Sequence, residues 1–311
     1  MPTLLQLITP TNLAEQKEKF FASRSYHPVF NYIWQSNRPQ IGIASNKEKL
    51  INAIINQDIA SIIHYARAYF SVEDWRYLEI AQQLTSSIPV LEEIYTPVDF
   101  IAAFTKAARF LGLHNYSVKV VDRTGFNFRP RVKDKIILMS KQANLQFFDI
   151  EGEVRHELVH IIRYENGKYN QIKKSANYLP TEEGLATLMH DTGKNGYASR
   201  FQHAAEYIAS RIGMEGSLRD IYDYFLSIGF NKDLAWQRAV RHKFGFIKTR
   251  ESGDILKPAM YFAHSQVLQK LSSVELLRLF VGKISLSDLI YYKEYRGVIE
   301  KDKLIQFYGL D

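Results

Sequence analysis

The first third of the chain is patterned mainly as helices. Between residues 47 and 70, isoleucines and leucines recur three or four positions apart, the spacing that places apolar side chains along one helical face. Pro97 opens another stretch of this kind, which runs over residues 97–111 with its phenylalanines on one side. We therefore expect residues 12–110 to be largely helical.

The apolar pattern changes after Gly112, where two short segments have the composition of strands. Residues 116–121 and 135–139 are rich in β-branched and other apolar side chains. The residues between them, 122–134, contain glycine and proline and are expected to form a loop. A small sheet is the simplest structure that these segments could build.

Helical patterning returns after the second strand. A helix is expected over residues 150–164, ended by the Asn-Gly pair that follows. A polar connection then reaches residue 180, and Thr181 could cap a second helix that ends near residue 191. Residues 197–309 are expected to be mostly helical with short breaks. The whole pattern predicts an α+β fold that is mostly helical.

Residues 156–160 read His-Glu-Leu-Val-His, the HExxH pattern, within the helix expected at 150–164. Histidines four positions apart share one helical face, so the imidazoles of His156 and His160 can reach one metal ion. Glu157 lies at the flank of that face, where it can take a proton from a water held by the metal. A helix with two ordinary histidines is the alternative. The apolar stripe of the same helix is Val154, Leu158, Ile161 and Ile162.

A catalytic zinc site needs a third protein ligand, and residues 181–186 offer two adjacent carboxylates. A glutamate about twenty residues beyond the second histidine, at the start of another helix, is the gluzincin arrangement. Glu183 is the preferred ligand, because it shares a face with Thr187 and His190, which could support it from behind. Glu182 would then be a solvated carboxylate at the helix start.

Two neighbouring features suit a peptidase site. Zincin peptidases bind substrate as an added strand on a sheet edge, and residues 135–140 are the better candidate for that edge. A simple structural hairpin is the alternative. Gly184 would let the second helix approach the site closely. Two histidines and a carboxylate suit zinc, although manganese, iron and cobalt accept the same donors.

Composition removes several alternatives. The chain has no cysteine, which excludes disulfides, thiolate ligands and cysteine nucleophiles and favours a reducing, cytoplasmic location. It has no run of the ~20 apolar residues that a membrane span needs, and its start lacks the basic and apolar segments of a secretory signal. The formal net charge of +7 favours acidic partners, but no nucleic-acid-binding motif is present. A solvated basic surface is the simpler interpretation of that charge.

Residues 156–163 and 182–186 together resemble the microtubule-associated tyrosine carboxypeptidase family, whose bacterial relatives carry a QEGLA motif. Residues 20–32 are similar to the N-terminal segment of that family. Residues 236–241, with Lys257 and Tyr261, resemble its Arg-rich and Lys-Asp-x-x-Tyr segments, although Pro258 stands in place of the Asp. This chain has two residues instead of three between the glutamate and second histidine of the metal motif. It also has Glu182 where the motif has Gln.

The resemblance implies a zinc carboxypeptidase that removes a C-terminal, tyrosine-like residue from a peptide or protein tail. With the motif, it predicts a zincin-like metallopeptidase fold with a small sheet packed beside the HExxH helix. Residues 1–110 would form an N-terminal helical region packed on a catalytic region, 111–311, and the two together are expected to make one compact unit. An acidic, tubulin-like tail would suit the basic chain.

The resemblance also suggests residues that bind substrate. Tyr261 is the candidate donor to the oxyanion, and Arg241 and Lys257 are candidates to bind the terminal carboxylate. An ordinary core tyrosine and a solvated helix face over residues 238–243 are the alternatives. Other functions consistent with the motif are a gluzincin aminopeptidase or endopeptidase. A non-catalytic binding or regulatory protein on a zincin scaffold is a further alternative.

Overall fold

The computed structural model describes residues 3–89, 96–122, 127–141 and 149–310. The chain divides into two compact units, one of residues 1–88 and 203–260 and the other of residues 89–202 and 261–311. This division differs from the predicted one at residue 110, because residues 203–260 group with the N-terminal helices.

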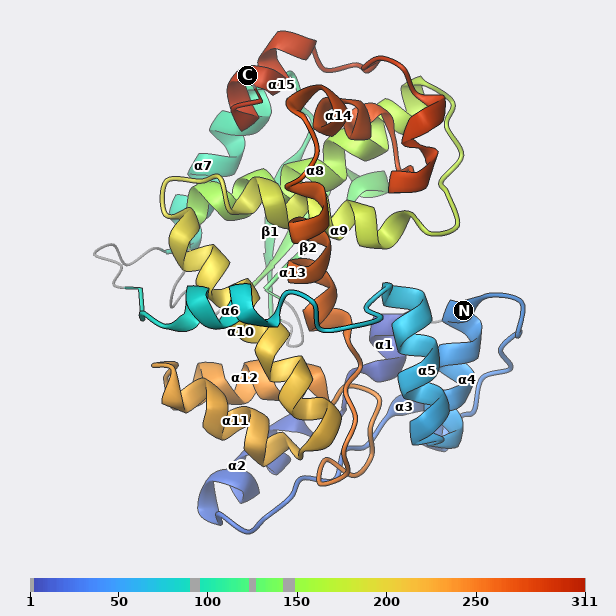
Figure 1. Cartoon of the computed structure of the whole chain (residues 1–311), viewed down its shortest axis with the longest axis vertical. Coiled ribbons are helices and arrows are strands. Elements are labelled where there is room, and N and C mark those ends of the chain that lie inside the picture. The colour runs from blue at the N-terminus through green and yellow to red at the C-terminus, as the bar shows by residue number, and fades with distance from the viewer. Residues whose placement is uncertain (1–2, 90–95, 123–126, 142–148, 311) are drawn as a thin grey trace. The chain divides into compact units, whose positions relative to one another are not determined.

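The first unit is helical (Figure 1). Its described helices are α1 (Leu4–Ile8), α2 (Leu13–Ala22), α3 (Ile33–Ser36), α4 (Asn46–Asn56), α5 (Ile59–Phe70), α6 (Leu78–Thr85), most of α10 (Gly196–Glu215), α11 (Leu218–Ser227), α12 (Lys232–His242) and the start of α13 (Lys257–Leu268). The apolar stretch 47–70 forms two helices, α4 and α5, which pack on each other. They are separated at Gln57, whose φ of 53° ends α4.

Aromatic side chains from distant segments meet in the core of the first unit. Phe20 on α2 is buried, and its ring lies 5.0 Å from that of Tyr222 on α11 and 4.9 Å from that of Trp236 on α12. These contacts join residues 1–88 to residues 203–260. They explain why the two stretches form one unit despite their separation in sequence.

The second unit contains a sheet of three strands in the order β1-β3-β2. Strand β1 (Ser117–Val121) is parallel to β3 (Ile136–Ser140), with Ser117 opposite Ile136. Strand β2 (Phe128–Arg131) is antiparallel to β3, with Phe128 opposite Met139. The strands at 116–121 and 135–139 are therefore confirmed.

Two details of the predicted sheet are wrong. The expected loop 122–134 contains strand β2 and a short 3₁₀ helix, η1 (Val132–Asp134). Pro130 is accommodated because β2 pairs only with β3 and lies at an edge. Residues 136–140 form the central strand, so the predicted substrate edge at 135–140 is already paired on both sides. The hairpin alternative also fails for β1 and β3, which are parallel.

Helix α7 (Pro97–Phe110) confirms the helix predicted from Pro97. Thr96 caps it in a capping box with Asp99, and Pro97 occupies the first turn, where no intrahelical N–H is needed. The helix packs on β1 and on α8 (Ile150–Tyr169). Buried Phe100 and Phe104 contribute to the same apolar core as the sheet and α8.

Helix α8 continues past the predicted Asn-Gly stop and ends at Tyr169. Asn166 is buried, and its amide donates to the carbonyl of Phe280 at 2.8 Å. A side chain at Gly167 would come within 3.4 Å of the backbone of Gly282. These tertiary contacts outweigh the low helix propensity of the pair. The predicted apolar stripe of this helix is buried, which is confirmed for Val154, Leu158, Ile161 and Ile162.

Helix α9 (Tyr178–His190) starts four residues earlier than predicted, with Asn177 instead of Thr181 at the cap position. Pro180 lies in its first turn, where proline costs no hydrogen bond. Thr181 is therefore not the cap; its buried hydroxyl accepts from the backbone N–H of Leu286 at 2.8 Å. Leu185 and Met189 of this helix are buried and belong to the same apolar core as α8.

The second unit is completed by the start of α10, the end of α13, α14 (Ser273–Arg278), the 3₁₀ helices η2 (Leu279–Val281) and η3 (Leu286–Tyr291), and α15 (Lys301–Tyr308). The mostly helical C-terminal third is thus confirmed. Among the described residues, no helix combines the length and apolar character that crossing a membrane requires.

Candidate metal centre

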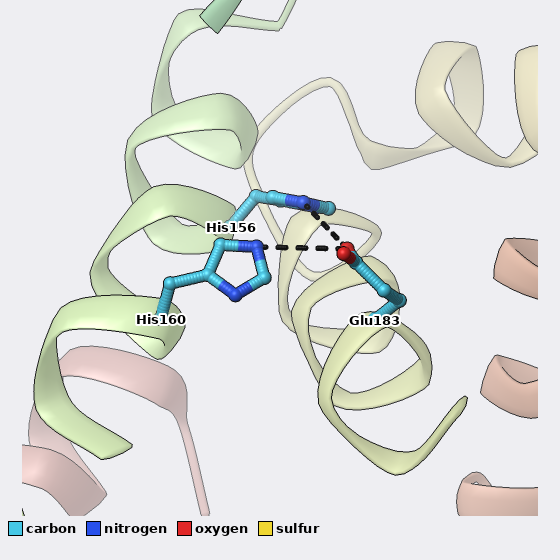
Figure 2. Close-up of side chains that lie close together, drawn as sticks. All are labelled: His156, His160 and Glu183. Atoms are coloured by element: carbon cyan, nitrogen blue, oxygen red, sulfur yellow. Dashed lines mark ion pairs between the residues drawn. The ribbon is translucent and has the colours of Figure 1, made fainter. Parts of the chain in front are cut away.

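Helices α8 and α9 pack side by side in the second unit and bring the predicted ligands together (Figures 1 and 2). His156 and His160 project from one face of α8 toward Glu183 on α9. Oε2 of Glu183 lies 3.7 Å from Nε2 of His156 and 3.6 Å from Nε2 of His160. The three potential ligand atoms lie within 4.8 Å of one another.

This geometry fits a single divalent ion. Zinc bonds of about 2.0–2.2 Å at tetrahedral angles place neighbouring ligand atoms about 3.4 Å apart. The two carboxylate-to-imidazole separations, 3.6 and 3.7 Å, are only slightly larger. The donor set of two imidazoles and one carboxylate is also that of catalytic zinc sites with an open position. His156 and Glu183 keep 13% and 14% of their side-chain surface exposed, so the site is not sealed.

Glu157 lies between the two histidines in sequence and is 4% exposed. Burial, with a smaller contribution from Glu183, raises its pKa to about 7, although His160 acts in the opposite direction. Its Oε2 is buried and has no hydrogen-bond partner among the described residues. Unpartnered buried carboxylate oxygens are costly, so this atom is available to a water or a substrate group.

Glu182 is a departure from the sequence prediction, because it is not a solvated carboxylate. It is 3% exposed, and its Oε1 lies 2.9 Å from Nδ1 of His160. Its Oε2 accepts from Arg163 at 3.4 Å, and its Oε1 also accepts from Lys283. Burial alone would raise the pKa of Glu182, but Lys283, His160 and Arg163 hold it well below its ordinary value.

Arg163 on α8 connects Glu182 to the segment that contains η2 and η3. The side chain is completely buried, and it donates to the carbonyls of Leu279, Gly282 and Ile284 at 2.6–3.0 Å. Burial lowers the pKa of this guanidinium from its usual value, while Glu182 acts to raise it. The η2–η3 segment is thereby fixed against the helix that carries both histidines.

Thr187 and His190 are expected to support Glu183 from the same face of α9, and that support stays a prediction. The ring of His190 lies 5.8 Å from that of His156, and its Nδ1 lies 3.6 Å from a carboxylate oxygen of Glu153. Thr187 is fully buried on the same helix. His160 is itself affected by the carboxylates: burial lowers its pKa, but Glu183 and Glu182 together raise it above the ordinary value.

The other predicted site residues have different surroundings. Tyr261 belongs to the same unit, and its ring lies 6.4 Å from that of His156. Arg241 and Lys257 belong to the first unit. There, Arg241 lies 3.6 Å from Oε1 of Glu206. The roles of Arg241 and Lys257 toward a substrate stay predictions.

Much of the segment 238–243 is not the solvated helix face considered from the sequence. His242 is completely buried between two carboxylates, with Nδ1 2.7 Å from Asp254 and Nε2 2.8 Å from Glu206. Arg238 donates to Glu206 at 2.8 Å. Burial raises the pKa of Glu206, but Arg241, His242 and Arg238 lower it far more. Much of the segment therefore lies in the interior of the first unit, where it forms ion pairs with Glu206 and Asp254.

Sequence reasoning missed the roles of Arg163, Glu182 and Lys283. One signal was present: Arg163 follows Ile162 on the apolar side of α8, and a buried arginine requires acceptors. A carboxylate is one such acceptor, and Glu182 is the neighbour of the preferred ligand. Lys283 had no such signal, because it lies about a hundred residues farther along the chain.

Comparison with known proteins supports the resemblance inferred from the motifs. No family model matches the chain. The rat protein named microtubule-associated tyrosine carboxypeptidase 1 is 23% identical over 321 residues, which cover 98% of this chain. This chain is a distant relative of microtubule-associated tyrosine carboxypeptidase 1. The mouse and human proteins of that name are 23% and 24% identical, also over 98% of the chain. The chain spans 64–65% of the length of these relatives.

Proposed function

We propose that the protein is a zinc-dependent carboxypeptidase on a zincin-like fold. The observation that carries this proposal is the convergence of His156, His160 and Glu183 from two packed helices. The distant relatives are named carboxypeptidases, which supports removal of a C-terminal residue. We extend the proposal to a tyrosine-like residue, an acidic protein tail and a cytoplasmic location.

Metal binding, proton transfer and oxyanion stabilisation can each be assigned to residues of this site. His156, His160 and Glu183 would hold the ion. When bound, zinc supplies Lewis-acid polarisation of the scissile carbonyl and acidifies a water molecule. Glu157, with its unpartnered Oε2, takes up the proton of the attacking water and returns it to the leaving amine. Tyr261, near His156, is the candidate donor to the developing oxyanion.

Carboxypeptidase specificity needs a cation for the terminal carboxylate of the substrate. Arginine binds carboxylates with two parallel hydrogen bonds, so Arg241 remains the stronger candidate and Lys257 the other. Arg241 keeps 36% of its side-chain surface exposed while it lies near Glu206. It could therefore bind a second carboxylate with its free edge.

A peptide panel tests this proposal. Zinc-loaded protein would be incubated with peptides ending in tyrosine, phenylalanine, alanine or glutamate, each with a free or an amidated C-terminus. We expect loss of a single C-terminal residue, fastest for tyrosine, and only from peptides with a free carboxylate. Cleavage that tolerates amidation but requires a free N-terminus would indicate an aminopeptidase, and internal cleavage of doubly blocked peptides an endopeptidase.

Glu157→Gln is the matched control for this panel. Gln retains the shape of the side chain but cannot accept the proton, so turnover should fall about 10²–10⁴-fold while zinc stays bound. Cleavage at the wild-type rate by this variant would refute the assignment of Glu157. Zinc binding without any hydrolysis of the panel by the wild type would favour the non-catalytic alternative.

A further inference from the structure

His160 lies between two consecutive carboxylates of α9. Its Nε2 faces Glu183 at 3.6 Å, whereas its Nδ1 faces Glu182 at 2.9 Å. The two ring nitrogens therefore have different partners. Only the Nδ1 contact has the length of a hydrogen bond, while the Nε2 contact leaves room for an ion.

The Glu182 contact determines which nitrogen carries the proton. An ionised carboxylate can only accept hydrogen bonds, so Nδ1 must be the donor. In the neutral imidazole, Nε2 then has the lone pair that a metal ion requires. Carboxylates placed in this way orient metal-binding histidines and increase their basicity.

Glu182 is fixed in its position by two cations. Lys283 donates to the oxygen that also contacts His160, and Arg163 donates to the other oxygen at 3.4 Å. Arg163 is itself fixed by three backbone carbonyls. Since the carboxylate is 3% exposed and both its oxygens have partners, it is not free to swing toward the ion in place of Glu183.

The contacts of Lys283 connect this group to the loop before α9. Its backbone carbonyl accepts from the N–H of Ser175 at 3.0 Å, and its ammonium lies 5.7 Å from the centre of the Tyr178 ring. Lys283 is thus fixed at both its backbone and its side chain. The position of Glu182 consequently depends on a segment distant in sequence from the HExxH motif.

We propose that Glu182 is a positioning residue for the metal site, which keeps the proton of His160 on Nδ1 and presents Nε2 to the ion. Lys283 and Arg163 hold Glu182 in this orientation. This inference rests on the proposed function, because it requires that His160 bind a metal. Under this inference Glu183 binds the metal and Glu182 orients His160, whereas sequence spacing alone leaves both glutamates as candidates for the third ligand.

Zinc affinity of the metal-stripped protein, measured in competition with a chromophoric chelator, tests the inference without using activity. Glu182→Gln removes the charge with little change of shape, and we expect it to weaken zinc binding about 10-fold or more. Glu182→Ala also removes the acceptor and should weaken binding up to about 100-fold. Because Ala removes the carboxylate that pairs with Lys283 and with the buried Arg163, the Ala variant should be less stable, and zinc binding by the Gln variant is the deciding measurement if the Ala variant does not fold.

Two further variants complete the design. Glu165→Gln removes an ion-paired carboxylate on α8, which contacts Lys135 and Tyr116, and should leave zinc affinity unchanged. Lys283→Met leaves the contact between Glu182 and His160 in place and should weaken zinc binding less than Glu182→Gln does. A larger loss of zinc affinity in Lys283→Met than in Glu182→Gln would contradict the proposal that Glu182 acts on His160 directly and Lys283 only through Glu182.

The outcomes separate the inference from the proposed function. Zinc binding by Glu182→Gln within about threefold of the wild type would overturn the inference and leave the proposed function intact. A wild-type protein that binds no zinc would overturn the proposed function, and the inference with it. Equal weakening by Glu165→Gln and Glu182→Gln would show a general loss of stability and would also overturn the inference.

Discussion

A Cβ atom on Gly184 would lie 2.6 Å from the Cβ of His264 and 2.9 Å from its backbone carbonyl carbon. Gly184 follows the candidate ligand Glu183 on α9, and His264 follows Tyr261 by three residues on α13. The close approach of the two helices therefore brings the ligand and the candidate oxyanion donor to neighbouring positions. The sequence predicted a close approach at this glycine but could not identify the partner.

Gly184→Ala should therefore disturb the site. The nearest atoms include backbone, which cannot move aside as a flexible side chain can, so overpacking should cost about 1–3 kcal/mol of unfolding free energy. Urea denaturation would measure this. Gly42→Ala is the control, because its added methyl group would meet only the end of the Glu48 side chain, at 3.1 Å. Equal stability of the two variants would contradict the account of this contact.

Tyr261→Phe separates the oxyanion role from the core-tyrosine alternative. If the hydroxyl stabilises the transition state, kcat should fall about 10²–10³-fold with little change in KM or in zinc affinity. Steady-state kinetics on a peptide with a free C-terminal tyrosine would measure both constants. Tyr169→Phe is the control, since this tyrosine is 62% exposed at the end of α8. Unchanged kcat in Tyr261→Phe would remove the residue from the mechanism.

The buried ion pairs of the first unit predict a pH dependence of stability. Burial lowers the pKa of His242, but Asp254 and Glu206 outweigh it and raise the pKa from 6.5 to about 9. A raised histidine pKa stabilises the folded state fully below pH 6.5, and this stabilisation is lost as the pH rises toward 9. Burial lowers the pKa of Lys243 to about 8. The charged form of Lys243 therefore destabilises the folded state, and this destabilisation decreases only as the pH rises above about 8.

Between pH 6.5 and 8, the difference between the wild type and a His242 variant measures the effect of His242, because the raised pKa values of Glu157 and His160 also make stability depend on pH there. The unfolding free energy of the wild type should fall there by about 1–2 kcal/mol. A difference of one bound proton between the folded and unfolded states changes this free energy by about 1.4 kcal/mol per pH unit. His242→Gln should show a flatter dependence over the same interval. Stability that is constant or rises with pH in the wild type would contradict the ionised state assigned to His242.

The sequence predicted the parts of the fold that depend on local patterns. Helix α7, the strands at 117–121 and 136–140, and the helices that carry the HExxH motif and Glu183 follow from periodicity and caps. Convergence of His156, His160 and Glu183 also follows, because the motif fixes two ligands on one face and leaves few carboxylates as the third.

Contacts with other segments account for most of the errors. Strand β2 forms because β3, which follows it closely in sequence, offers it a partner, although β2 contains Pro130. The other contacts are long-range. The Asn166-Gly167 pair stays helical because residues more than a hundred positions away bind and pack against it. Glu182 is buried because Arg163 and Lys283 neutralise it. Local sequence carries little information about partners so distant, whereas a fold determines them directly.

Titration of the metal-stripped protein with zinc, in wild type and in Glu183→Gln, tests the central claim most directly. The account predicts one zinc per chain in the wild type and affinity weakened by more than about 100-fold in Glu183→Gln, because a lost ligand should cost more than a lost supporting partner. Glu183→Gln that binds zinc as tightly as the wild type, or a wild type that binds none, would contradict it.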